Sequence, residues 1–188
     1  MAKIGLSNFR YGFLTESSNG TATYSGAKTP GHAISCNVEV SNNDASLYGD
    51  DVLIESDKTF NYATVTMGID EDDVVTMSDL LGHTVNDETG EMVRNANDTA
   101  PYVGLGRIIT KMVNGAYKYK VEFLNKVKFA EPSQENQTKG ESVEFSTVEI
   151  EGTASALLNG DWSKTETFDT KAEAIAYLEG LLGGAISV

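Results

Sequence analysis

The sequence predicts a mainly β fold, sandwich-like or barrel-like, with one or two flanking α-helices. Apolar and polar residues alternate with a period of two along much of the chain, as in strands with one buried face. Two shorter segments have helical spacing instead. No internal repeat, low-complexity tract or linker divides the 188 residues, so we expect a single domain over 1–188.

The clearest strand covers residues 117–129. Its apolar residues are expected to share one face: Tyr117, Tyr119, Val121, Phe123, Val127 and Phe129. The other face would carry charged residues: Lys118, Lys120, Glu122, Lys126 and Lys128. At about 3.3 Å per residue the strand would be roughly 40 Å long, which suits a barrel or a sheet shared between subunits. Just upstream, Asn114-Gly115 predicts a two-residue hairpin turn to a partner strand over 102–112, because both positions need positive φ.

Shorter alternating segments predict further strands at 9–15, 32–40, 60–69, 141–151 and 163–168. In 141–151 the apolar face begins with Val143 and Phe145 and then switches to Val148 and Ile150. Because a shift of one residue moves every later side chain across the sheet, we expect a bulge near Ser146 or Thr147.

Two helices are predicted from caps and apolar spacing. Asp70 is the expected N-cap of a helix carrying Val74, Met77 and Leu81 and closed by Gly82. The second helix covers about 171–182. Thr170 and Glu173 form a capping box before it, and Ile175, Leu178 and Leu182 form the stripe that docks on a sheet.

The segment of about 41–59 begins polar and then carries large apolar residues between acidic ones: Leu47, Tyr48, Val52, Leu53 and Ile54. One interpretation is a long loop that packs on a neighbouring copy. The other is a simple hairpin on its own sheet. Residues 131–139 are polar and loop-like.

Charge and composition narrow the classes of function. Fourteen basic against 28 acidic residues give a net charge of −14, which repels nucleic acid and disfavours a sequence-reading DNA or RNA binder. The same sign suits a protein that lets DNA pass without binding it, and equally an acidic surface kept for solubility. Cys36 is the only cysteine, so no intrachain disulfide can form. We expect no signal peptide and no membrane anchor.

No motif indicates catalysis, a cofactor or a metal. His32 and His83 are far apart and belong to no ligand motif. Asp70-Glu71-Asp72-Asp73 lacks the calcium-loop pattern. Gly104-Leu105-Gly106 has no phosphate-loop lysine after it and instead indicates close backbone approach or a bend. We therefore expect the protein not to be an enzyme.

Lys118, Lys120, Lys126 and Lys128 form a basic row with three interpretations. The row could be a weak nucleic-acid stripe or a solvated outer face. It could also meet an acidic patch on an identical neighbour, which would set the register of a ring or stack.

The order of several segments resembles that of major tail proteins, the tail tube proteins of long-tailed, non-contractile bacteriophages of Gram-positive bacteria. The segments are 2–12, 27–39, 63–68 and 102–106, and the similarity extends to about Ala156. The resemblance implies the tail tube fold, with six copies in a ring and rings stacked on a tape-measure protein. DNA would pass through the lumen during ejection, and the protein would reside in the virion after assembly in the host cytoplasm.

On this basis we expect the 41–59 segment to reach an adjacent subunit through Leu47, Tyr48 and Leu53. The alternatives are a monomeric β-sandwich that binds carbohydrate or a receptor, for which Trp162 is the candidate platform, and another phage structural protein such as a tail terminator or capsid decoration protein. An acidic hydrolase is disfavoured, because no base, nucleophile or metal set can be named.

Overall fold

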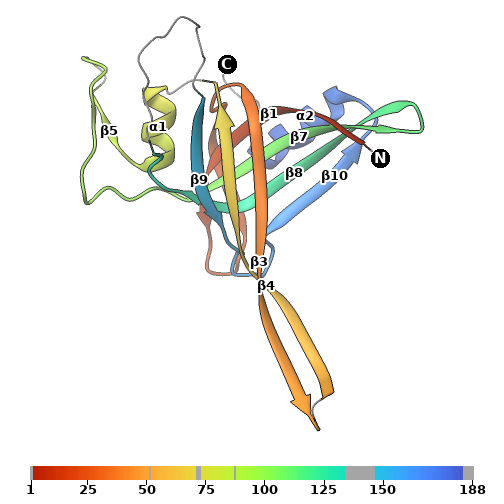
Figure 1. Ribbon diagram of the computed structural model, residues 1–188. Helices are drawn as coiled ribbons and strands as arrows, with labels where there is room; N and C mark the ends of the chain where they lie inside the picture. Colours follow the sequence, from red (N-terminus) through yellow and green to blue (C-terminus); the bar gives the residue numbers. More distant parts are fainter. Residues whose placement is uncertain (1, 51, 71–72, 87, 134–146, 184–188) are drawn as a thin grey trace, which may run out of the picture.

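A computed structural model describes residues 2–50, 52–70, 73–86, 88–133 and 147–183. The predicted fold class is confirmed: the protein is mainly β, with one large antiparallel sheet and two helices (Figure 1). The strands of the sheet are β1 (Ala2–Glu16), β2 (Ala22–Lys28), β3 (Ala33–Gly49), β4 (Val52–Ile69), β7 (Val103–Val113), β8 (Ala116–Phe129), β9 (Val148–Ala154) and β10 (Ser163–Phe168). A separate short pair joins β5 (Thr84–Val85) to β6 (Met92–Val93). The sequence prediction missed β2 and this short pair.

The sheet is centred on β8. The strand order is β2-β1-β7-β8-β9-β4-β3, and β10 also pairs with β8. One edge of β8 pairs with β7 along most of its length, whereas the other edge is shared between β10 and β9. The sheet curls so that β3, at one end of the order, returns beside β1 without pairing to it. This curl encloses the larger apolar core, which includes Phe9, Tyr11, Met67, Val127 and Ile150.

The two helices cover different parts of the sheet. Helix α1 (Val74–Leu81) contributes Met77 and Leu80 to the larger core. Helix α2 (Lys171–Leu181) packs over β7 and β8, where Ala174, Leu178 and Leu182 meet Ile108, Val121 and Phe123 in a second core.

The helix ends follow local hydrogen bonding. Thr170 and Glu173 form the predicted capping box of α2, and Gly82 ends α1 in the left-handed conformation as predicted. The predicted N-cap Asp70 is wrong. The cap of α1 is Asp73, whose carboxylate accepts the Thr76 backbone N–H at 3.1 Å. Asp70 accepts the backbone N–H of His32 instead, at 2.7 Å.

The predicted hairpin between β7 and β8 is confirmed, since Asn114 and Gly115 both have positive φ. The prediction of a single apolar face along β8 is wrong beyond Phe123. Leu105 pairs with Leu124 but Val103 pairs with Val127, so β8 carries one extra residue there. Val121 and Phe123 accordingly pack under α2, whereas Val127 and Phe129 belong to the larger core. In the sequence the alternation breaks at this point, where the adjacent apolar pair Phe123-Leu124 is followed by polar Asn125.

Residues 41–59 are not a loop. β3 and β4 pair continuously from Ala33 opposite Ile69 to Gly49 opposite Val52. Because β9 pairs with β4 only over Ala63–Ile69, the outer half of this hairpin has no third strand. It projects from the body as a two-stranded arm, which we call the ribbon (residues 41–60) (Figure 1). The hairpin interpretation was therefore right about the local structure, but the outer half lies beyond the body of the sheet.

The other strand predictions at 9–15, 32–40, 60–69, 102–112 and 163–168 fall within or closely match observed strands. Val143, Phe145 and Ser146 lie outside the described residues, as does most of the predicted 131–139 loop, and β9 begins at Val148.

Candidate interaction surfaces

The ribbon exposes a concentration of large apolar side chains. Leu47, Tyr48, Val52, Leu53 and Ile54 are between 49% and 67% exposed. They contribute to neither apolar core. Such a concentration of large exposed apolar side chains is typical of an interaction site in a folded protein. An isolated two-stranded hairpin is also only marginally stable in water, so a binding partner would add the packing that the ribbon lacks.

The ribbon is acidic as well as apolar. Asp44, Asp50, Glu55 and Asp57 are all exposed, and the ribbon's single cation, Lys58, pairs with Asp44 at 3.2 Å. The register places Leu47 opposite Glu55 and Ala45 opposite Asp57. Directly opposed residues share a face. One face of the ribbon therefore combines Leu47 with two carboxylates that have no ion-pair partner within the described parts of the chain.

The predicted row of four lysines is not one surface, because the bulge in β8 divides it. Lys126 and Lys128 alternate with Val127 and Phe129 and lie on the opposite side from that pair. Lys126 bonds to Glu16 at 2.8 Å, and the Nζ atoms of Lys126 and Lys128 lie 4.8 and 5.5 Å from the centre of the Tyr102 ring. These two lysines thus stabilise their own chain.

Lys118 and Lys120 lie on the face of β8 turned away from α2, since they alternate with residues that pack under that helix. Lys118 forms an ion pair with Asp169, and Lys120 with Glu122, which also binds Arg107 at 2.6 Å. The register adds two cations to this side. Lys118 is directly opposite Lys111 of β7, which is directly opposite Lys3 of β1. We call this set, Lys3, Lys111, Lys118 and Lys120, the lysine face. Sequence reasoning missed Lys3 and Lys111, because only strand pairing brings them beside Lys118.

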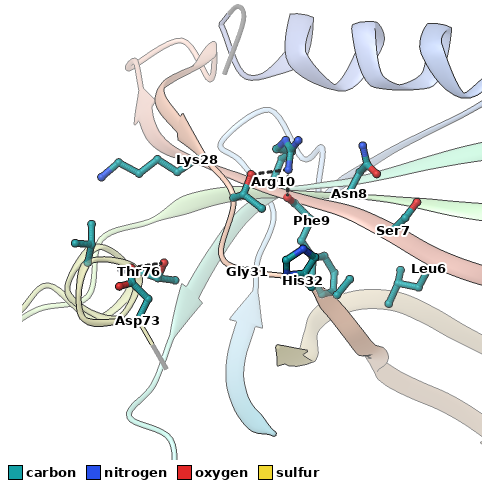
Figure 2. A pocket seen from close by; sticks show the side chains of 13 residues that line it. Leu6, Ser7, Asn8, Phe9, Arg10, Lys28, Gly31, His32, Asp73 and Thr76 are labelled. Atoms are coloured by element: carbon teal, nitrogen blue, oxygen red, sulfur yellow. Dashed lines mark hydrogen bonds between the residues drawn. The ribbon is translucent and has the colours of Figure 1, made fainter. Parts of the chain in front are cut away.

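A groove of about 740 Å³ lies between β1, the β2–β3 connection and the start of α1. Figure 2 shows residues Leu6 to Arg10 on one side of it and Asp73 and Thr76 on another. Its cations already have partners: Arg10 donates to the Thr29 hydroxyl at 2.5 Å, and Lys28 to Asp79 at 2.6 Å. Asp79 also accepts the hydroxyl of buried Tyr11 at 2.8 Å. These contacts tie β1 and β2 to α1.

The two histidines are both bound to carboxylates. His32 is mostly exposed, and Asp70 accepts its backbone N–H at 2.7 Å and lies 2.8 Å from its Nδ1. The backbone bond first, and then the contact with the ring, hold the pKa of the Asp70 carboxyl below its usual value. His83 is only 4% exposed and lies between Asp98, at 2.8 Å, and Glu131. Sequence reasoning missed this second cluster, since its members are widely separated along the chain. Among the described residues no three His, Cys, Asp or Glu side chains are placed to hold a metal ion.

No protein-family model matches the chain, and no curated protein sequence is significantly similar to it. Neither of the helices in the described parts of the chain has the length and apolar character needed to cross a membrane.

Proposed function

We propose that this protein is a structural subunit that self-assembles head to tail into rings, which stack into a tube. The observation that carries the proposal is the ribbon. The ribbon carries five large exposed apolar side chains and projects away from the body. A neighbouring molecule can therefore cover these side chains, which the chain itself leaves exposed.

The charge of the ribbon favours one kind of assembly. Two ribbons that met each other in a symmetric dimer would bring their carboxylates together, because Lys58 is the only cation against four described acidic residues. A ribbon that binds a different surface of the next copy avoids this repulsion. Such an interface is heterologous, and heterologous interfaces repeat into closed rings or open filaments.

The resemblance to tail tube proteins supports the more specific form of the proposal. It suggests six copies per ring, stacking on a tape-measure protein, and a place in the phage virion after assembly in the host cytoplasm. The net charge of −14 suits a conduit through which DNA moves without binding. No catalytic role is part of the proposal.

A monomeric binding module is less well supported. Its candidate platform, Trp162, stacks on Phe60 with ring centroids 4.5 Å apart, and both residues pack against the larger core. Trp162 is therefore partly buried and stacked on another ring of its own chain.

The test is assembly of a variant with a charge on the ribbon. Leu53→Asp should prevent rings or tubes while leaving the circular dichroism spectrum unchanged, because Leu53 is exposed and outside both cores. The measurements are negative-stain electron microscopy and sedimentation velocity over a range of concentration and salt.

Leu158→Asp is the matched control, since Leu158 is also a largely exposed leucine but lies far along the chain, after β9. It should assemble like the wild type. Normal assembly of Leu53→Asp would show that the ribbon is not an essential contact. A wild-type protein that stays monomeric under all conditions would contradict the proposal.

A further inference from the structure

The lysine face is electrostatically unfavourable in the isolated chain. Lys3, Lys111 and Lys118 lie side by side on three neighbouring strands. Like charges directly opposite one another destabilise a sheet. In the described residues only Lys118 of these three has an acidic partner, Asp169. Within the described residues Lys3 and Lys111 therefore remain without an acidic partner, although the chain has twice as many acidic as basic residues.

The ribbon has the complementary pattern. Glu55 and Asp57 are two residues apart on β4, and Lys111 and Lys118 are directly opposite one another on β7 and β8. The first spacing is about 7 Å and the second about 5 Å, so the two carboxylates can reach the two ammonium groups together. Leu47 lies opposite Glu55 on the same ribbon face and adds apolar area to that contact.

The two surfaces are not in contact within one molecule. No ion pair among the described residues joins the ribbon to the lysine face. Figure 1 shows the ribbon and the β7–β8 turn projecting from the body in different directions. The carboxylates of one copy can therefore meet the lysine face of another copy.

We propose that the lysine face is the docking site for the ribbon of the next copy, with Glu55 and Asp57 set against Lys111 and Lys118. This rests on the proposed function, because the occupant is a second copy of the chain. Complementary charge would define the orientation and register of the contact, while the apolar residues of the ribbon would supply most of its buried area.

Charge reversal on each side tests the pairing. Lys111→Glu and Glu55→Lys should each raise the concentration needed for assembly roughly tenfold or more, because each sets like charges against one another. An equimolar mixture of the two variants should assemble like the wild type, since every ribbon then finds a lysine face of opposite charge. Sedimentation velocity at low salt measures this, and the wild-type contact should weaken as salt rises.

Two controls separate this effect from misfolding and from loss of charge alone. Lys111→Glu should raise the melting temperature of the unassembled chain slightly, because it breaks the row of like charges. Lys164→Glu makes the same charge change on the side of the sheet that faces α2, as Lys164 is opposite Phe123. That variant should assemble normally.

The outcomes distinguish the docking site from the proposed function. If the wild type forms rings or tubes and both reversal variants do so at the same concentration, the docking site is wrong and self-assembly stands. If each variant alone fails to assemble and their equimolar mixture also fails to assemble, the proposed pairing is wrong as well. If Lys111→Glu abolishes binding to a DNA duplex without affecting assembly, the lysine face binds DNA and is not the docking site for a second copy. A wild type that never associates contradicts both proposals.

Discussion

Glu16 shows how single side chains connect distant parts of this fold. It lies at the end of β1 and is only 12% exposed. One carboxylate oxygen accepts a hydrogen bond from Lys126 of β8 at 2.8 Å, and the other accepts the Leu158 backbone N–H at 2.6 Å. The Lys126 bond, followed by the Leu158 bond, lowers the pKa of Glu16.

A lowered pKa in the folded state gives a definite dependence on pH. As pH falls, Glu16 is protonated in the unfolded chain before it is protonated in the folded one. The charged carboxylate therefore adds its full stabilisation of the folded state above the unfolded pKa of about 4.3. It is lost as pH falls through the lower folded value. We expect Glu16→Gln to reduce the free energy of unfolding by about 1 to 2 kcal/mol at pH 7.

The difference between Glu16→Gln and the wild type should shrink towards pH 3. Urea unfolding at the two pH values measures it, and Glu39→Gln serves as an exposed control with little effect at either pH. An equal loss of stability at pH 7 and pH 3 would show that the charge of Glu16 does not matter.

At the scale of elements, the contact between β7 and its neighbours depends on two glycines. A Cβ on Gly104 would lie 2.5 Å from the Tyr24 ring and 2.6 Å from the Phe123 ring. Those rings form an edge-to-face pair with centroids 5.0 Å apart. A Cβ on Gly106 would collide with the end of Leu178 on α2. Of the two interpretations of Gly104-Leu105-Gly106, close approach to the backbone or a bend, the first is therefore confirmed, with side chains as the approaching groups.

Gly104→Ala should destabilise the protein by about 1 to 3 kcal/mol, because two packed rings and a β-strand must move to admit one methyl group. Thermal unfolding followed by near-ultraviolet circular dichroism would report both the stability and the environment of the rings. Gly5→Ala is the control, since nothing lies within 4 Å of its added Cβ. Equal melting temperatures for the two variants would mean that the sheet relaxes around Gly104.

At the scale of the whole molecule, the body and the ribbon differ in how much apolar surface they bury. The body contains both apolar cores, whereas the outer residues of the ribbon are exposed throughout their described length. Because stability follows buried area, the ribbon contributes little to it.

Replacing residues 44–58 by an Asn-Gly turn should therefore leave the melting temperature of the monomer within a few degrees of the wild type, as the cores are untouched. The shortened chain should not assemble. Differential scanning calorimetry of the monomer and electron microscopy together measure this. A large fall in melting temperature would mean that the ribbon supports the fold of its own chain.

The sequence by itself was sufficient for the features that depend on neighbours along the chain. The mainly β class, the Asn114-Gly115 turn, the capping box at Thr170 and the end of α1 at Gly82 all follow from local conformational preferences. The apolar residues of the ribbon were also singled out from the sequence, since they stand between acidic residues, and the structure shows them exposed.

Only the tertiary structure decided how those local features combine. The N-cap of α1 is Asp73 and not Asp70, and the Asp70 carboxylate instead accepts the backbone N–H of His32, which is distant in sequence. The extra residue in β8 placed Lys126 and Lys128 away from Lys118 and Lys120, and the pairing of β1, β7 and β8 brought Lys3 and Lys111 beside Lys118. Strand register depends on partners far along the chain, so no local pattern contains it.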